Sequence, residues 1–358
     1  MRILYVAPEH VSGTLSLFKR EHERRGDTCR YVTFWHSNSN FPDDICLNLG
    51  GMPNRAWVRK IRRMVTHDPD LTPSRISNSR LPAWSPNPFT RSLFALRDEL
   101  NWRKIRSVIE EHDLFSYDVL HLDGGCDFTR DSRFARAFKR KGKGVVAYYH
   151  GSDLRSRGYI PSVDCITDLR LTPEWDLAVM DNRLHYLYLP VGIESFEFKK
   201  YAPERTFRIG HAARNSFKGT SFVVQAYEHL RKKYDVELIL ISGMAYQDAL
   251  AAKRSCDVFV DQLTNEAGWG YGMSGVEALA MGVPVITNIP EQMRPLIQDH
   301  PFVHATPETI VPVLESCLLD PHRMGALSAY SRNWAIERHA TVQVTDVLYA
   351  HYHRLGWH

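Results

Sequence analysis

Short apolar runs alternate along the chain with stretches of helical periodicity, and this alternation predicts the fold. The apolar run at 1–6 is followed by a Ser-Gly-Thr turn, a helical pattern over 15–25, and a second run at 29–35 that is rich in β-branched and aromatic residues. Strand, turn, helix and strand in this order are typical of the opening of a Rossmann-like domain. We therefore expect an α/β protein with parallel sheets.

The same alternation continues to the end of the chain. Its 358 residues are enough for two domains of ordinary size. Apolar runs of strand length and amphipathic runs of helix length follow one another. The expected strands are 118–122, 144–149, 208–212, 236–242, 257–261 and 285–287. The expected helices are 93–112, 128–140, 221–233, 248–255, 276–281, 307–318 and 321–354.

Residues 36–92 interrupt this pattern with many Pro, Ser and Asn, and we expect them to be irregular. Within them, apolar residues of 57–65 share one helical face, opposite a basic face. This pattern is typical of a helix lying on an anionic membrane, and equally of a helix docked on a protein core. The apolar residues are Trp57, Val58, Ile61, Met64 and Val65, and the basic ones are Arg59, Lys60, Arg62 and Arg63.

The net charge of +4 conceals a local basic excess. Between Pro53 and Arg106 there are twelve Arg or Lys and four Asp or Glu, a net of +8, which leaves −4 for the remainder. Such an excess favours an anionic partner such as membrane lipid or a lipid-phosphate acceptor, and a solvated basic surface is the alternative. A nucleic acid is not the partner we expect.

Cysteine usage and hydropathy indicate the compartment. The six cysteines form no CxxC pair and have no metal-binding spacing, which fits a reduced, cytoplasmic setting. No apolar run approaches the length of a membrane span, and the run at 3–7 is too short for a signal peptide. We expect a cytoplasmic protein, with peripheral contact at the inner membrane face through 55–65 as an option. The D-x-D pattern at 68–70 lies in a Pro-broken loop, and we attribute it to chance.

The stretch 268–287 carries the clearest chemistry. A glycine-dense turn precedes a predicted helix at 276–281, with Glu277 in its first turn, and a Gly-Val-Pro turn then leads into the strand at 285–287. Glycines let a ligand approach the backbone, a helix N-terminus favours phosphate, and a carboxylate suits sugar hydroxyls. The stretch can therefore hold both halves of a sugar nucleotide. An ordinary Gly-rich turn, with Glu277 complementing the helix dipole, is the alternative.

This stretch also resembles a known family. Gly270-Tyr271-Gly272, followed by Glu277-Ala278-Leu279-Ala280-Met281-Gly282-Val283-Pro284-Val285, is similar to the nucleotide-sugar motif of retaining glycosyltransferases of family 4. Trp269 stands where that family has its first Glu, and Glu266 lies three positions out of register. The resemblance is firm over roughly 190–345 and loose over 1–190.

The resemblance implies the GT-B fold, with two Rossmann-like domains facing each other across a cleft. It places an acceptor-binding domain at 1–192, a nucleotide-sugar-binding domain at 193–335, and a C-terminal helix at 336–358 that crosses back to the first domain. It implies transfer of a sugar from a UDP- or GDP-sugar to a saccharide, lipid-linked or other acceptor. The anomeric configuration would be retained, and neither a metal nor another cofactor would be required.

Candidate site residues follow from spacing and from the resemblance. Arg214 and Lys218 are four residues apart, so their cations can converge on one diphosphate. His150 and Asp153 follow the strand at 144–149, and Asp123 follows the strand at 118–122, where α/β sheets bind ligands. The resemblance assigns catalytic roles to Arg214, Lys218, Glu277 and His150, with Glu277 on the donor ribose. It places Gly13, Gly243, Met244, Trp269, Gly270, Tyr271, Gly272, Met273 and Ser274 at the donor, and Ser12, Asp123 and Asp153 at the acceptor or cleft.

Two other functions fit the same residues. A sugar-nucleotide epimerase or hydrolase on this fold would consume donor without an acceptor. A non-catalytic module would bind a nucleotide sugar or an anionic surface without turnover, and Trp269 in place of Glu is consistent with it.

Overall fold

The computed structural model describes residues 1–37, 40–50, 81–202, 206–212, 216–266 and 268–357. They form two compact units, one of Met1–Tyr188 with Thr345–His358 and one of Leu189–Val344. The change of unit falls between 188 and 189, rather than between 192 and 193, and the chain returns to the first unit at 345, rather than at 336. The predicted interfacial helix at 55–65 and the D-x-D pattern at 68–70 lie outside the described residues.

The first unit is built on a seven-stranded sheet in the order β3-β2-β1-β4-β5-β6-β7, and all of its strand pairs are parallel. The order reverses direction between β1 and β4, which makes this pair the topological switch point of the sheet. The strands are β1 (Arg2–Ala7), β2 (Thr28–Thr33), β3 (Ile45–Cys46), β4 (Val119–Asp123), β5 (Gly144–Tyr148), β6 (Leu169–Thr172) and β7 (Leu184–Tyr186).

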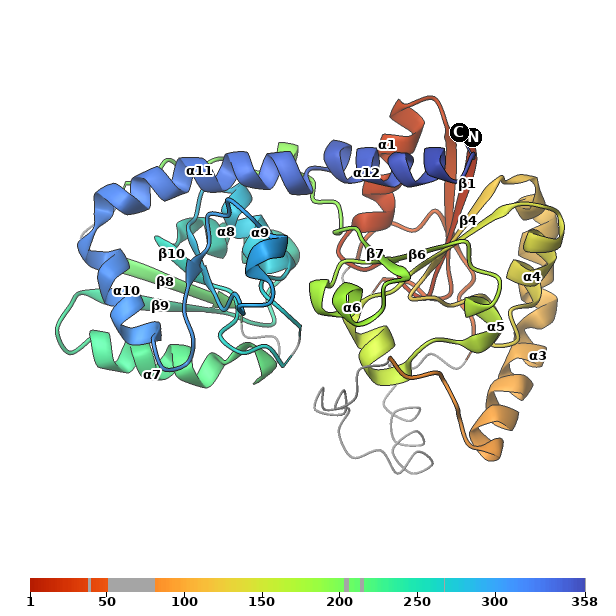
Figure 1. The fold of residues 1–358 in the computed structure, drawn as a ribbon, viewed down its shortest axis with the longest axis horizontal. Coiled ribbons are helices and arrows are strands. Elements are labelled where there is room, and N and C mark those ends of the chain that lie inside the picture. The colour runs from red at the N-terminus through yellow and green to blue at the C-terminus, as the bar shows by residue number, and fades with distance from the viewer. Residues whose placement is uncertain (38–39, 51–80, 203–205, 213–215, 267, 358) are drawn as a thin grey trace. The chain divides into compact units, whose positions relative to one another are not determined.

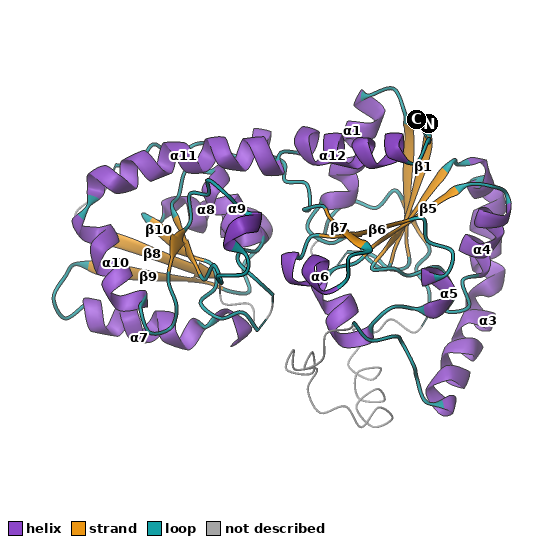
Figure 2. Ribbon diagram, in the orientation of Figure 1, coloured by secondary structure: helices purple, strands orange, loops and turns teal. Residues whose placement is uncertain are grey.

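Both faces of this sheet are covered, because alternate residues of each strand point to opposite sides. Leu4 and Leu120 belong to the hydrophobic core on one face, together with Phe134. Tyr5 faces the other way and stacks on Phe18, with the ring centroids 5.6 Å apart. Figures 1 and 2 show the helices α3 and α4 on one side of the sheet and α1 and α12 on the other. The helices are α1 (Thr14–Arg24), α3 (Pro88–Glu111), α4 (Arg133–Arg140), α5 (Pro161–Asp164), α6 (Trp175–Met180) and α12 (Thr341–Arg354).

The second unit has a five-stranded parallel sheet in the order β12-β11-β10-β8-β9. Its switch point lies between β8 and β10. Helices α7 and α10 cover one face, while α8, α9 and α11 cover the other (Figure 1). The strands are β8 (Phe207–Ala212), β9 (Val236–Ile241), β10 (Val258–Val260), β11 (Val285–Thr287) and β12 (Val303–His304). The helices are α7 (Thr220–Leu230), α8 (Tyr246–Ser255), α9 (Met273–Ala280), α10 (Ile310–Leu319) and α11 (Pro321–His339).

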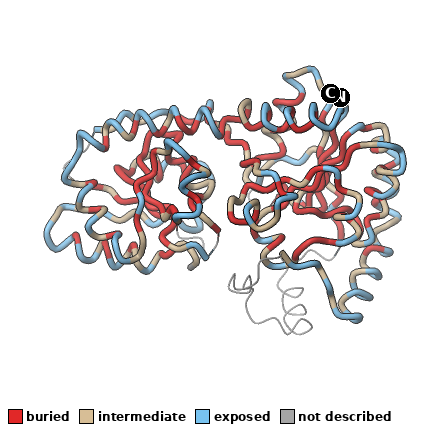
Figure 3. Tube along the Cα trace, viewed as in Figure 1, coloured by how far each residue is buried: buried red, intermediate tan, exposed pale blue. Residues whose placement is uncertain are grey.

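Figure 3 shows most strands of both sheets buried, with exposure mostly on the outer faces of the helices and in the loops, whereas the edge strand β9 is only partly buried. The expected α/β architecture with two parallel-sheet domains is therefore confirmed. Among the described residues, no helix combines the length and the hydropathy that crossing a membrane requires.

Several element boundaries differ from the prediction. The helix expected from 128 begins at Arg133, because Ser132 adopts a left-handed conformation with φ of 59°. The helix expected over 321–354 is two helices, because Ala340 is extended and the Val191 N–H donates to the carbonyl of His339 at the break, 2.9 Å away. Strands β3, β6 and β7 lie in parts of the chain for which no strand was predicted.

Candidate functional site

The switch point of the second sheet gathers the donor-site candidates. The chain leaves the carboxyl end of β8 toward Lys218, and it leaves β10 at Asp261. The carboxyl edge at a switch point is where α/β sheets bind ligands. Arg214, the predicted partner of Lys218, lies outside the described residues, so its convergence with Lys218 stays a prediction.

Lys218 is held at this edge by a buried carboxylate. Its Nζ lies 2.5 Å from Asp261 Oδ1, and the other carboxylate oxygen, Oδ2, accepts the Gly272 N–H at 2.6 Å. The Lys218 side chain keeps 15% of its surface exposed, whereas Asp261 has none. The ammonium therefore lies beside the first turn of α9 and is accessible to a ligand.

The N-terminus of α9 offers further hydrogen-bond donors. Gly272 is the N-cap, and the N–H groups of Met273 and Ser274 have no acceptor among the described residues. Such unpaired N–H groups, next to an ammonium, favour a phosphate. The helix begins at Met273 rather than at 276, so Glu277 lies in its second turn and not in its first.

Side-chain hydrogen bonds fix the loop before α9. Thr287 Oγ1 donates to the carbonyl of Gly270 at 2.5 Å, and Gln262 Nε2 donates to the carbonyl of Gly268 at 3.0 Å. Gly270 has a φ of 82°, and a Cβ there would lie 2.4 Å from the Met293 side chain, so only glycine fits without a shift. These contacts hold the loop before α9 in one conformation.

The side chain of Tyr271 anchors this loop in an aromatic cluster. Its ring is 9% exposed, stacks on Phe302 with the centroids 4.6 Å apart, and meets Trp334 edge to face. The Tyr271 hydroxyl lies 3.3 Å from Nε2 of His339, and burial lowers the pKa of that imidazole to about 3. A neutral aromatic cluster thus holds the loop. Trp269, two residues earlier, is half-buried.

Glu277 is buried, with both of its oxygens already engaged. Tyr246 Oη donates to Oε1 at 3.0 Å, and Lys253 Nζ donates to Oε2. The side chains of Lys253 and Glu277 are only 5% and 7% exposed. Each carboxylate oxygen can accept a second hydrogen bond, so contact of Glu277 with a ribose hydroxyl stays a prediction.

The loop after β9 carries the other donor-site candidates of this unit. Gly243 has a φ of 65°, and Met244 is 45% exposed. Tyr246, two residues further, connects this loop to Glu277 through its hydroxyl. The structure therefore brings the segment around 243–246 together with α9, on the same edge of the sheet as Lys218.

The first unit brings His150, Asp123 and Asp153 together at the carboxyl ends of β4 and β5. His150 Nε2 lies 2.8 Å from Asp123 Oδ1, and the His150 N–H donates to Asp153 Oδ2 at 3.0 Å. Burial by itself would lower the pKa of His150, but the charge and hydrogen bond of Asp123 outweigh it and raise the pKa to about 9. Burial is the main cause that raises the pKa of Asp153. His150 is consequently cationic at neutral pH.

This pKa gives a pH-dependent prediction. His150 should titrate near pH 9, and Asp123→Asn should lower its midpoint, because Asp123 is the largest of the causes that raise it, while Asp153 and Glu174 still raise it in the variant. A group with a raised folded pKa stabilises the fold below its unfolded pKa and loses that effect as the pH rises through the folded value. The stability advantage of the parent protein over Asp123→Asn should therefore be absent above about pH 9 and should grow as the pH falls below that value, until it levels off below the His150 midpoint of the variant.

Imidazole NMR shifts, assigned with His150→Gln, measure the midpoint, and urea unfolding at several pH values measures the stability difference. Asp131→Asn is the control, because Asp131 pairs with Arg133 and Thr129 and not with His150. An unchanged His150 midpoint in Asp123→Asn would contradict the assignment.

Ser12 and Gly13 lie after β1, on the same edge of the first sheet. Both have positive φ, 56° and 71°, and Gly13 is the N-cap of α1. A Cβ on Gly13 would approach Phe41 to 3.1 Å. The sheet topology thus places them at the switch point beside the end of β4, while no described hydrogen bond joins them to Asp123 or His150.

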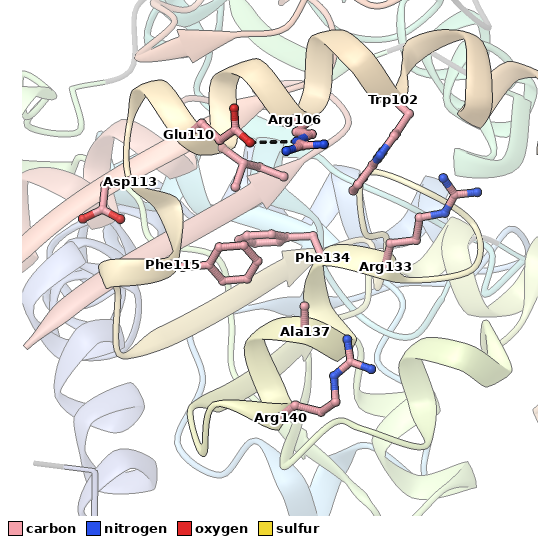
Figure 4. Close-up of a pocket in the computed structure, with 10 residues that line it drawn as sticks. Trp102, Arg106, Glu110, Asp113, Phe115, Arg133, Phe134, Ala137 and Arg140 are labelled. Carbon is pink, nitrogen blue, oxygen red and sulfur yellow. Dashed lines mark hydrogen bonds and ion pairs between the residues drawn. The ribbon is translucent and has the colours of Figure 1, made fainter.

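Other features lie apart from these residues. A cavity of about 540 Å³ lies between α3 and α4 of the first unit, with aromatic side chains on its floor and charged groups at its rim (Figure 4). None of the candidate site residues lines it. Across the described parts of the chain, one group of three potential metal ligands occurs, formed by His36, Asp43 and Cys46 near the ends of β2 and β3.

Sequence reasoning did not find Asp261 and Lys253, nor the contact of Tyr246 with Glu277. Asp261 ends a predicted apolar strand, and an acidic residue at the carboxyl end of a strand is a signal that could have marked it. Tyr246 and Lys253 reach Glu277 across 31 and 24 residues of sequence, and no local pattern marks such a pairing.

The comparisons with known proteins agree with this geometry at the level of fold. No family model matches the chain, and no curated protein matches its sequence. HepE of Anabaena, solved in complex with UDP, has a TM-score of 0.57 at 12% identity, with 99% of this chain and 100% of that chain covered. Sucrose-phosphate synthase from Thermosynechococcus elongatus has a TM-score of 0.59 at 13% identity, with 99% of both chains covered.

A Listeria monocytogenes protein assigned as a UDP-N-acetylglucosamine 2-epimerase has a TM-score of 0.53 at 11% identity, with 99% of this chain and 96% of that chain covered. Identities this low carry information about fold and not about chemistry. Together with the two parallel sheets and the position of the switch points, the full-length matches show that this chain has the GT-B fold of glycosyltransferase structures.

Proposed function

We propose that this protein is a glycosyltransferase that moves a sugar from a UDP-sugar to a carbohydrate or lipid-linked acceptor. The observation that carries the proposal is the Lys218 ammonium beside the N-terminus of α9, where Met273 and Ser274 present unpaired N–H groups. An ammonium and a helix N-terminus at a switch point suit a diphosphate. HepE, which shares the fold, was solved with UDP and with UDP-glucose. This favours UDP over GDP as the nucleotide.

In this proposal Lys218 stabilises the charge that develops on the leaving diphosphate, together with Arg214. Glu277 accepts from the ribose with its remaining lone pairs, and Gly243 and Met244 lie beside the nucleobase. The backbone of Gly270, Tyr271 and Gly272 faces the donor. Each role, apart from that of Arg214, uses a group that lies at the carboxyl edge of the second sheet.

The acceptor side of the proposal uses the first unit, where Asp123 and Asp153 would accept from substrate hydroxyls. A base that is already protonated cannot take the acceptor proton, and His150 is cationic at neutral pH. We propose transfer with retention, in which the leaving phosphate takes that proton. Because Lys218 and the α9 N-terminus already supply positive charge, we propose that transfer needs no metal. The basic segment 53–106 would then favour an acceptor at an anionic membrane surface, with the enzyme in the cytoplasm.

The test is a transfer assay with a panel of UDP- and GDP-sugars, each with saccharide and lipid-linked acceptors, with and without EDTA. We expect release of UDP that requires an acceptor and is unchanged by EDTA, and a product whose anomeric configuration, measured by NMR, equals that of the donor. Donor consumption without acceptor would instead identify an epimerase or a hydrolase. Binding of UDP without turnover in any combination would identify a non-catalytic module.

A further inference from the structure

Asp261 has no role in the proposed chemistry, yet it lies at the centre of the donor site. Its carboxylate is fully buried at the carboxyl end of β10. Burying a carboxylate is unfavourable unless charged and hydrogen-bonding partners compensate. Both of its oxygens have such partners, the Lys218 ammonium on Oδ1 and the Gly272 N–H on Oδ2, at 2.5 Å and 2.6 Å.

These two contacts connect the ammonium rigidly to the start of α9. A free lysine side chain has a large rotamer entropy, and holding it in one position before the ligand arrives removes that cost from binding. Lys218 is also held at its backbone, where its carbonyl accepts the Leu263 N–H at 3.0 Å. An ammonium has three N–H donors, so the one used on Asp261 leaves two for a ligand.

The glycine at 275 is explained by the same carboxylate. A Cβ at Gly275 would lie 2.7 Å from Asp261 Oδ2, closer than non-bonded atoms approach. A side chain at 275 would therefore push Asp261 away from both Gly272 and Lys218. The first turn of α9 is built around this carboxylate, while the N–H groups of Met273 and Ser274 stay available.

We propose that Asp261 is a positioning residue, which fixes the Lys218 ammonium against the N-terminus of α9 so that both meet the diphosphate of the donor. The inference rests on the proposed function. A carboxylate this close lowers the local positive potential, so its effect on a phosphate ligand comes from orientation and not from attraction. The proposal is therefore distinct from a simple count of charges, which predicts tighter phosphate binding once the carboxylate is removed.

The test compares Asp261→Asn with the parent protein by calorimetric titration of UDP and of uridine. Asparagine keeps the shape of aspartate but has only one oxygen acceptor. If that oxygen accepts from the Gly272 N–H, the NH2 group faces the Lys218 ammonium, which must then move. If it accepts from Lys218, the NH2 group faces the Gly272 N–H, and the contact with α9 is lost. We expect the affinity for UDP to fall about tenfold or more, equivalent to about 1.4 kcal/mol, and the affinity for uridine to stay within about twofold. Uridine lacks the diphosphate, so a general disturbance of the site would weaken both ligands alike.

Asp257→Asn is the matched control. Asp257 is likewise buried, lies at the amino end of the same strand, and pairs with Lys199 at 3.4 Å. The Asp257→Asn substitution should leave the affinities for UDP and for uridine unchanged. Gly275→Ala is a second variant, which displaces the carboxylate by contact and should reproduce the selective loss of UDP affinity even if Asp261→Asn does not fold.

The outcomes separate the two proposals. If the parent protein binds no nucleoside diphosphate, the proposed function fails and this inference fails with it. If the parent binds UDP and Asp261→Asn binds it equally well or more tightly, the positioning role alone is overturned. Equal weakening of UDP and uridine also overturns it, because that result is what a purely structural residue would give.

Discussion

Replacing Lys218 with alanine is expected to lower kcat for sugar transfer by about 10²–10³-fold, as the loss of a preorganised charge on a developing anion does in other enzymes. The negative charge on the leaving diphosphate grows as the glycosidic bond breaks, so the ammonium contributes more in the transition state than in the ground state. KM for the donor should therefore rise much less than kcat falls. Initial rates over a range of donor concentrations, with UDP release as the readout, measure both.

The control for this variant is Lys199→Ala. Lys199 also pairs with a buried aspartate of β10, Asp257, but at the amino end of the strand, away from the carboxyl edge. The Lys199→Ala substitution also removes a lysine that pairs with a buried carboxylate, but it leaves the proposed donor site unchanged. Comparable kcat values for Lys218→Ala and Lys199→Ala, in proteins that remain folded, would refute the role of Lys218.

Replacing Lys253 with methionine is expected to lower the free energy of unfolding by about 3–5 kcal/mol, the usual effect of removing one partner of a buried ion pair. The change leaves the Glu277 carboxylate inside the second unit with Tyr246 Oη as its remaining side-chain donor. Both Lys253 and Glu277 are almost fully buried, and the methionine side chain fills the place of the lysine without offering a hydrogen-bond donor. Urea unfolding at pH 7, followed by circular dichroism, measures the loss.

Two further variants test whether the loss of unfolding free energy in Lys253→Met comes from a buried, unpaired charge. Lys233→Met breaks the exposed pair with Glu315, in which Lys233 is 69% exposed, and it should change stability far less than Lys253→Met does. The double variant Lys253→Met/Glu277→Leu removes both charges and should recover most of the loss, because an apolar pair avoids the desolvation penalty. A loss in Lys253→Met no larger than that in Lys233→Met would show that Glu277 is not sealed from solvent.

The fold could be predicted from sequence because it depends on local patterns. The strand at 285–287 and the helix ending at Arg24 are recognisable from β-branched runs, helical periodicity and a terminal glycine. The short strands β3, β6 and β7 could not be, since β3 has only two residues, and β6 (Leu-Arg-Leu-Thr) and β7 (Leu-His-Tyr) lack the run of β-branched residues that marks 285–287. The kink at Ala340 depends on a hydrogen bond from Val191, which lies far away in sequence.

The donor site was predictable in its backbone and not in its side-chain partners. Gly270 and Gly272 are marked by their spacing, and Gly270 requires glycine because its φ is 82° and a Cβ there would lie 2.4 Å from Met293. The hydrogen bonds that Lys253 and Tyr246 donate to Glu277 follow from the packing of α8 against α9. No local sequence pattern reveals this packing. The position of Asp261 at the end of a strand could be predicted from the sequence. Its ion pair with Lys218 could not, because that pair depends on the pairing of β8 with β10.

The return of the chain to the first unit affects the order in which the two units can fold during synthesis. Residues 345–358 complete the first unit, where Leu348 and Tyr352 are fully buried and Trp357 packs against Gly144. Tyr349 also hydrogen-bonds His22 there, at 2.9 Å. The ribosome makes these residues after all of 189–344, so the second unit is complete in sequence while the first still lacks a buried part of its core. On the ribosome, therefore, the first domain to be synthesised is the last that can complete its core. This reverses the usual order, in which the N-terminal domain folds first.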